Sequence, residues 1–281
     1  MIDLHTHSNV SDGTDTPTVL LAKAKNAGLK VIALTDHDTD LGWQEAIANL
    51  PLNLELVLGC EFSALDSRGK SVHILGLLFD NQNQKIQENF LQVKESRIDR
   101  SKKILKLLNS GGFLVTEEEL FSAVPTGATL GRPHIADLLV KKGYLKDRNE
   151  AFAKVLNDNS PFYVGHDAPT SANIIEMIKS AGGVSILAHP RSTWSDYEFF
   201  ERELKSMVAA GLDGIEVNHR DHSLENRREL FECAAQYNLI PTGASDYHGN
   251  GKLNLLGENT TSEDSFERLK SKVVFGNIYQ R

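Results

Sequence analysis

The chain has 281 residues, of which 40% are hydrophobic and 24% charged, and these fractions are typical of a globular protein. They exclude the disordered, collagen-like and coiled-coil classes. With 30 basic and 38 acidic residues the net charge is −8, which argues against a broad electrostatic grip on duplex DNA but leaves room for a small anion bound locally.

The sequence carries no recognisable membrane or export pattern. No segment approaches the ~20 apolar residues that a membrane helix needs, and residues 1–5 contain neither a basic region nor an apolar one. We therefore expect a cytoplasmic protein with no membrane partner. Cys60 and Cys233 lie far apart in the chain, so we expect no disulfide framework.

Seven short apolar segments are predicted to form strands. In chain order they cover residues 2–7, 31–35, 54–60, 72–75, 184–188, 214–217 and 239–243. Helical patterns lie between most of them: Thr16 and Pro17 begin a helix that Gly28 ends, and further helices are expected at 171–182, 197–211 and 224–237. This alternation predicts an α/β fold with a mainly parallel sheet.

Residues 81–165 break the alternation, because they show only helical patterns. A long polar and apolar run covers residues 84–108, and Thr116 with Glu119 forms a capping box. The sequence Arg132-Pro133-His134 opens another helix, with its proline in the first turn.

We interpret residues 81–165 as a helical subdomain inserted between two parts of a barrel, residues 1–80 and 166–281. Without the insertion, a little under 200 residues remain for seven strands, which is short against the roughly 250 residues of an eight-unit barrel. An irregular barrel of about seven units fits this length better.

Potential metal ligands lie on these strands or follow them. His5 and His7 are two residues apart on a strand, so their side chains emerge on the same face. In a parallel barrel the carboxyl ends of the strands share one face, where active sites are built. Seven separate segments would then deliver nine donors to one cleft: His5, His7, Asp12, His37, Glu61, His73, His189, Asp246 and His248.

The simplest alternative is that these strands end in polar residues only because loops commonly do. However, nine imidazoles and carboxylates cannot crowd into one cleft without a strong cation, since buried carboxylates repel one another and buried imidazoles lose hydration. Mixed imidazole and carboxylate ligation suits manganese, iron or zinc better than calcium or magnesium. Nine donors are enough for two or three divalent ions, and we expect Mn²⁺, with Zn²⁺ or Fe²⁺ as alternatives. Such ions would make the cleft positive in an acidic protein.

These residues resemble the four motifs of the polymerase and histidinol phosphatase (PHP) family of metal-dependent phosphoesterases. The residues that carry the resemblance are His5-Thr6-His7 with Asp12, Thr35-Asp36-His37-Asp38, Glu61, His73, Ala188-His189-Pro190 and Ser245-Asp246-Tyr247-His248. The resemblance implies a distorted (β/α)7 barrel with a trinuclear site. By this analogy one ion would be bound by His5, His7, Glu61 and Asp246, a second by Glu61, His73 and His189, and a third by Asp12, His37 and His248. The resemblance also implies that Glu61, Asp246 and His189 are the catalytic residues.

The helical insertion resembles the branch of the family that removes the 3′-phosphate of 3′,5′-nucleoside bisphosphates such as adenosine 3′,5′-bisphosphate. Relatives in that branch also act as 5′→3′ exoribonucleases on short single-stranded RNA, which is the alternative function. Arg132 and His134 lie in the first turn of a helix, where backbone N–H groups favour an anion, although Arg132 could also be simply solvated. Arg191 and His222 are further candidates for substrate contact.

Two further sets of polar side chains are open to more than one interpretation. Lys94, Arg97 and Arg100 on the long helix could face the cleft, but a charged helix face is usually just solvated. His219 and His222 follow one predicted strand and should face the same cleft. His222 could bind the substrate, transfer a proton, or only support the residues that do so.

The expected reaction is hydrolysis of a phosphomonoester by in-line attack of a hydroxide that bridges two ions. A zinc amidohydrolase is a less favoured alternative, because Glu61 stands where such enzymes usually carry a modified lysine, and Asp12 and His248 would be superfluous there. A metal-binding module without activity is the other alternative.

Overall fold

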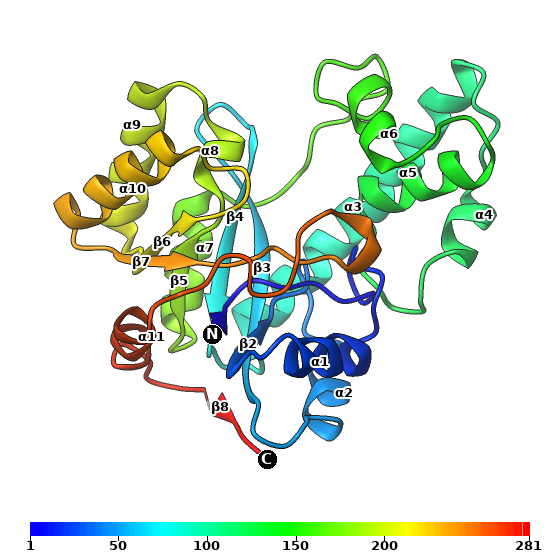
Figure 1. Ribbon diagram of the computed structural model, residues 1–281. Coiled ribbons are helices and arrows are strands. Elements are labelled where there is room, and N and C mark those ends of the chain that lie inside the picture. Colours follow the sequence, from blue (N-terminus) through cyan, green and yellow to red (C-terminus); the bar gives the residue numbers. More distant parts are fainter. Residues whose placement is uncertain (277) are drawn as a thin grey trace.

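The computed structural model describes residues 1–276 and 278–281, and its strands form one curved sheet (Figure 1). The strands are β1 (Ile2–Asp3), β2 (Val31–Leu34), β3 (Glu55–Leu65), β4 (Ser71–Leu77), β5 (Val184–Leu187), β6 (Gly214–Asn218), β7 (Ile240–Gly243) and β8 (Ile278–Tyr279). Strands β1 to β7 lie side by side in chain order, and β8 pairs with β3. A bridge between Thr6 and Tyr247 brings the end of the sheet back to its beginning, so the predicted seven-stranded barrel is nearly closed.

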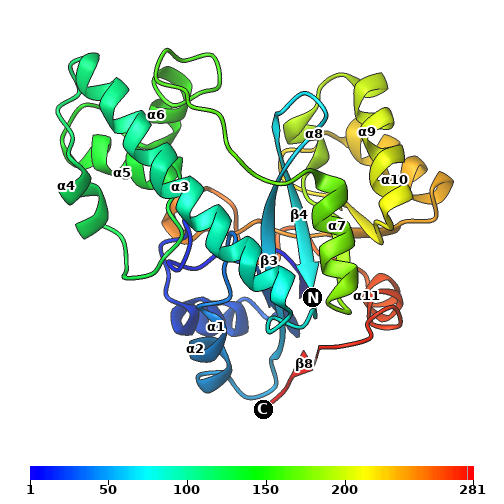
Figure 2. The same cartoon turned by 180° about the vertical axis from the view of Figure 1, so that it is seen from behind.

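Helices cover the outside of this barrel and form a second lobe beside it (Figures 1 and 2). They are α1 (Pro17–Asn26), α2 (Trp43–Ala48), α3 (Gln84–Ser110), α4 (Glu117–Ser122), α5 (Arg132–Lys141), α6 (Arg148–Lys154), α7 (Ser171–Ser180), α8 (Pro190–Thr193), α9 (Tyr197–Ala210), α10 (Leu224–Gln236) and α11 (Glu263–Lys270), with a 3₁₀ turn at Gly249–Gly251. None of the helices in the described part of the chain combines the length and the apolar character needed to span a membrane.

Local signals set the ends of several helices. The Thr16 hydroxyl accepts a hydrogen bond from the N–H of Val19 at 3.3 Å, Pro17 occupies the first turn, and Gly28 has a φ of +81° just after α1. The capping box at Thr116 and Glu119 is also present at the start of α4. These predicted helix boundaries are confirmed.

The sheet departs from the predicted mainly parallel pattern at β3 and β4. Strand β4 runs antiparallel to both β3 and β5. Strand β3 continues past its predicted end at Cys60 to Leu65, so Glu61 lies within a strand and not at its end. His73 lies near the start of β4 and reaches the same end of the barrel, because an antiparallel strand begins where its neighbour ends.

The alternation of side chains along β3 explains why Glu61 faces inward. Val57 packs inside the barrel with Leu75, whereas Cys60 and Phe62 pack against the surrounding helices. Side chains two residues apart share a face, so Glu61 shares the inner face with Val57. The apolar barrel interior thus ends in a polar layer that begins with Glu61.

Helix α3 connects the barrel to the helical lobe, as Figure 2 shows. It has 27 residues and is about 40 Å long. Ile86 and Phe90, near its start, pack in the cluster around the barrel, whereas Ile104 and Leu108 pack with α4, α5 and α6 in a separate apolar cluster. We propose that residues 81–165 are an inserted subdomain held to the barrel by the first half of α3.

Arg97 on α3 joins the two parts of the molecule. Its Nε and Nη2 donate hydrogen bonds to the Asp38 carboxylate at 2.9 and 2.7 Å, and Nη2 also donates to the Ser63 hydroxyl at 2.8 Å. Nη1 donates to the carbonyl of Leu130 at 2.9 Å. Asp38 is fully buried and has a φ of +52°, so this ion pair also holds a backbone conformation that side chains rarely adopt.

Arg97→Met should therefore destabilise the protein strongly, because it leaves the buried Asp38 carboxylate without its cation. Breaking a buried pair in this way costs about 3–5 kcal/mol of unfolding free energy. Urea unfolding of the variant measures the loss, with Arg228→Met on the exposed side of α10 as the matched control. Equal, small losses in both variants would show that the Arg97 pair does not hold the two parts together.

Candidate metal centre

Six histidines and three carboxylates lie together at one end of the barrel. His5 and His7 follow β1, with Asp12 in the next loop, while His37 follows β2, Glu61 is on β3, His73 on β4, His189 follows β5, and Asp246 and His248 follow β7. Six of the nine side chains are almost completely buried. The other three, His37, His73 and His189, are 12%, 26% and 13% exposed.

Glu61 lies at the centre of the cluster, and its two oxygens face different histidines. Oε2 is 3.2 Å from the Nε2 atoms of both His5 and His7. Oε1 is 2.9 Å from His73 Nδ1 and 2.9 Å from His189 Nε2. A carboxylate placed in this way can bridge two cations, one on each oxygen.

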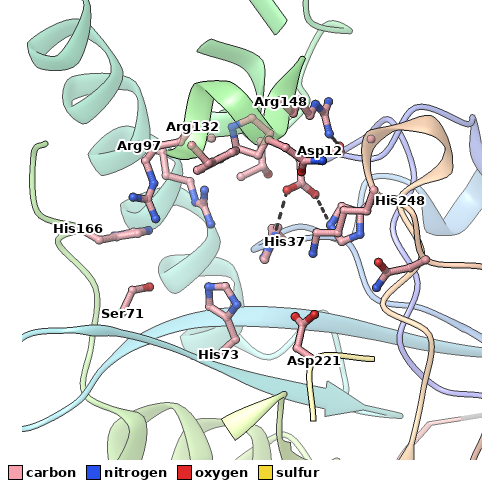
Figure 3. Close-up of a pocket in the computed structure, with 18 of the residues that line it drawn as sticks. Asp12, His37, Ser71, His73, Arg97, Arg132, Arg148, His166, Asp221 and His248 are labelled. Atoms are coloured by element: carbon pink, nitrogen blue, oxygen red, sulfur yellow. Dashed lines mark hydrogen bonds and ion pairs between the residues drawn. The ribbon is translucent and has the colours of Figure 1, made fainter. Parts of the chain in front are cut away.

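Asp12 is a second carboxylate of the cluster that faces two histidines. Its Oδ1 is 3.2 Å from His248 Nε2, and its Oδ2 is 3.7 Å from His37 Nε2 (Figure 3). Burial alone would raise the pKa of Asp12, but its interactions with the neighbouring imidazoles of His248 and His37 hold that pKa well below its usual range. The carboxylate is thus ready to bind a cation without first losing a proton.

Asp246 closes the cluster from the β7 side. Its Oδ1 is 3.5 Å from His5 Nε2 and 3.4 Å from His7 Nε2, and its Oδ2 pairs with Lys252 at 2.6 Å. Asp246 has a φ of +53° and His189 a φ of +29°, both in the left-handed region that non-glycine residues seldom adopt. Strained backbone of this kind concentrates at functional sites, where surrounding contacts hold it in place.

The donors fit divalent cations. In three overlapping subsets, one ligand atom of each residue lies within 4.8 Å of all the others: His7, Asp12, His37 and His248; His5, His7 and Glu61; and His37, Glu61 and His73. Within the described residues, His37 Nδ1, His73 Nδ1, His248 Nε2 and Asp246 Oδ1 are buried and make no hydrogen bond. Buried polar atoms are normally paired, so atoms aimed at one another without hydrogen bonds indicate that a cation completes them.

The protonation states agree with this interpretation. Burial opposes ionisation of Glu61, but the imidazoles of His73, His37 and His5 keep its pKa well below the usual range. Burial lowers the pKa of His37 to about 3, so this imidazole is neutral and can ligate at pH 7. Burial also opposes protonation of His7, but the carboxylates Asp246 and Glu61 outweigh it and raise its pKa to about 9. Binding a cation therefore displaces a proton from His7.

A cavity of about 540 Å³ opens onto this cluster (Figure 3). Asp12, His37, His73 and His248 form part of its wall. The remaining wall comes largely from the helical lobe and from the loop after β7, and its cationic side chains are Arg97, Arg100, Arg132, Arg148, Arg220 and Lys252. An acidic chain thus presents a locally basic cavity over the cluster.

The four substrate residues proposed from the sequence have different positions. Arg132 lines the cavity, although its Nη1 already pairs with Asp158 at 2.7 Å. The ring nitrogens of His134 contact the N–H of Gly131 at 3.0 Å and the carbonyl of Ser11 at 2.8 Å, so this side chain holds two backbone segments together.

Arg191 and His222 lie outside the cavity wall that the described residues form. The Arg191 guanidinium packs over the ring of Tyr197, at 5.9 Å from its centroid. His222 faces the carbonyl of Val217 at 2.9 Å and accepts the N–H of Arg191 at 3.3 Å. Backbone and packing contacts thus occupy His134, Arg191 and His222 in this structure, and their contact with a substrate stays a prediction.

Sequence reasoning missed one side chain that touches the cluster. Glu216 on β6 is fully buried and lies 3.0 Å from His5 Nδ1. Burial would raise its pKa, but the neighbouring His5 outweighs this and lowers the pKa of Glu216 to about 2. His219, which the sequence already placed at this cleft, has its Nε2 3.6 Å from Asp246 Oδ2. A glutamate inside an otherwise apolar strand was the available signal for Glu216.

Comparisons with known proteins agree with this geometry. A model of the PHP domain matches residues 3–149. The chain is 31% identical over 252 residues to the 3′,5′-nucleoside bisphosphate phosphatase of Chromobacterium violaceum, covering 89% of this chain and 88% of that protein. It is 31% identical over 264 residues to a 5′-3′ exoribonuclease of Haemophilus influenzae, covering 94% and 95%. A crystal structure described as a metal-dependent phosphoesterase, from Bifidobacterium adolescentis, aligns with a TM-score of 0.89 at 38% identity, covering 97% and 96%.

Removing divalent ions is expected to lower the midpoint of thermal unfolding, because ions that bind only the folded chain stabilise it by mass action. At a free Mn²⁺ concentration one hundred times Kd, the gain is about 2.7 kcal/mol, or roughly 5–10 °C for a chain of this size. Calorimetry of chelated protein before and after Mn²⁺ addition measures the shift. An unchanged midpoint, with no metal by elemental analysis, would contradict a metal centre.

Glu61→Gln should release more metal than Asp12→Asn, although both changes preserve side-chain shape. Glu61 faces two sets of histidines through its two oxygens, whereas Asp12 faces one. Elemental analysis after dialysis should find Glu61→Gln depleted by about two ions and Asp12→Asn by about one, if each carboxylate serves the donors it contacts. Equal retention of metal by the two variants would rule out a bridging position for Glu61.

Proposed function

The chain belongs to the PHP family and is a metal-dependent phosphoester hydrolase, and we propose that it removes the 3′-phosphate from 3′,5′-nucleoside bisphosphates such as adenosine 3′,5′-bisphosphate. One observation carries the choice of substrate. A single cavity joins the donor cluster to a separate group of arginines, so it offers two places for phosphate groups of one small molecule.

Arg100 is the best placed of these arginines for the second phosphate. Its Nε donates to the carbonyl of Val164 at 2.9 Å, and none of the described residues provides a hydrogen-bond acceptor to its other two nitrogens. Burial and the charges of Arg132 and Arg97 lower its pKa to about 10, so it remains protonated at pH 7 despite the repulsion. A phosphate bound between Arg100 and Arg132 would relieve that repulsion and satisfy the free guanidinium nitrogens.

We propose that the nine clustered donors hold two or three divalent ions, with Mn²⁺ as the physiological ion. When bound, such ions supply a nucleophilic water at neutral pH and neutralise the charge that develops on the phosphoryl group. Glu61, Asp246 and His189 would hold the ions nearest the scissile phosphate. Arg100 and Arg132 would bind the 5′-phosphate and thereby fix the distance at which the 3′-phosphate meets the ions.

A 5′→3′ exoribonuclease acting on short single-stranded RNA is the second candidate. The relative from Haemophilus influenzae favours it at the same 31% identity as the bisphosphate phosphatase. The first nucleotide of a 5′-phosphorylated RNA also carries phosphates on both its 5′ and 3′ oxygens, so it presents the same two groups to the cavity. Phe152 and Leu253 on the cavity wall offer apolar surface to a base. Duplex DNA and membranes are not among the proposed partners.

Time courses with one preparation of Mn²⁺-loaded enzyme distinguish the two candidates. Inorganic phosphate release from adenosine 3′,5′-bisphosphate is compared with mononucleotide release from a short 5′-phosphorylated RNA. We expect a higher kcat/KM for the bisphosphate. A higher kcat/KM for the RNA would assign the chain to the exoribonucleases instead, and no cleavage of either substrate by metal-loaded enzyme would overturn the proposal.

Arg100→Met and Arg132→Met should each lower kcat/KM for the bisphosphate by roughly 10- to 150-fold, the value of one charge-assisted contact of about 1.5–3 kcal/mol. Hydrolysis of p-nitrophenyl phosphate should change little, since that substrate has no second phosphate. Arg228→Met controls for the loss of a cation elsewhere. If both substrates lose activity equally, the two arginines do not act by recognising a second phosphate.

A further inference from the structure

The carboxylate of Glu216 contacts two segments that carry donors of the cluster. It lies on β6 and is fully buried, and its neighbours Ile215 and Val217 pack in the apolar layer under the helices. One carboxylate oxygen is 3.0 Å from His5 Nδ1, and the other accepts the backbone N–H of His189 at 2.7 Å. A buried carboxylate in an apolar strand is costly, so its two contacts require an explanation.

The contact with His5 decides which nitrogen of that ring carries a proton. An ionised carboxylate only accepts hydrogen bonds, so His5 Nδ1 must be the N–H that donates to Glu216. In the neutral ring that binding a cation requires, the lone pair is then on Nε2, the nitrogen that lies 3.2 Å from Glu61 and 3.5 Å from Asp246. Glu216 therefore keeps His5 in the tautomer that can bind a cation at the centre of the cluster.

The second contact holds the backbone of His189. This residue has a φ of +29° and a ψ of 54°, and it precedes Pro190, which disfavours helical conformations in the residue before it. Its N–H donates to Glu216, and its Nε2 then lies 2.9 Å from Glu61 Oε1. The two oxygens of one carboxylate thus set the position of a donor on each side of Glu61.

We propose that Glu216 is a positioning residue of the metal centre, fixing the tautomer of His5 and the strained backbone of His189 together. The inference rests on the proposed ligand roles of those two histidines. Groups that orient metal ligands in this way typically contribute 10- to 100-fold to metal affinity.

Glu216→Gln tests the proposal with almost no change in shape. Glutamine has a single acceptor oxygen, so its NH₂ group must face either His5 Nδ1 or the N–H of His189. We expect Mn²⁺ affinity, measured by titration of the metal-free protein, to fall 10- to 100-fold. Glu203→Gln is the matched control, because Glu203 is also buried and accepts from the N–H of Ser67 at 3.0 Å, and none of its hydrogen bonds involves the nine donors.

A second measurement needs no variant and decides the matter even if Glu216→Gln fails to fold. Long-range ¹H–¹⁵N spectra of the wild-type protein loaded with diamagnetic Zn²⁺ should show His5 protonated at Nδ1 and bound to metal through Nε2. A proton on Nε2, or equal Mn²⁺ affinity in the two glutamine variants, would overturn the role of Glu216. Failure of the wild type to bind any metal would instead overturn the proposed metal centre.

Discussion

The carboxylate of Glu61 lies within 3.2 Å of nitrogen atoms from five histidines, and all of these groups are largely removed from water. Desolvation of so many titratable groups is unfavourable, and hydrogen bonds among them do not satisfy every atom. Divalent cations resolve this conflict, since each replaces lost hydration for several donors at once. The rest of the fold holds these groups together at one end of the barrel.

Several irregularities of the barrel serve that purpose. Strand β3 extends far enough to carry Glu61 on its inner face, and the antiparallel β4 returns His73 to the same end. The bridge between Thr6 and Tyr247 brings the segments after β1 and β7 together, so that His5 and Asp246 meet. Helix α3 then extends the scaffold into the helical lobe, and Arg100 and Arg132 line the same cavity as part of the cluster. Under the proposed function, substrate binding and metal-assisted chemistry depend on different parts of the chain.

Much of this arrangement could be predicted from the sequence. All seven barrel strands and the caps at Thr16 and Thr116 follow from local patterns of apolar, capping and turn residues. The antiparallel direction of β4 could not be predicted, because strand direction depends on pairing between distant segments. The surroundings of His134 and His222 escaped prediction for a related reason: an exposed histidine and one that bonds backbone carbonyls look identical in a sequence. Glu216 was overlooked because its partners lie on other strands.

Anomalous X-ray diffraction from crystals grown with Mn²⁺ tests the central claim most directly. If Glu61 organises the centre, anomalous peaks should lie on both sides of its carboxylate, one beside His5 and His7 and the other beside His73 and His189. A further peak near Asp12 would account for the remaining donors. Peaks confined to the protein surface, or Glu61 hydrogen-bonded to the histidines with no peak next to either oxygen, would contradict the account.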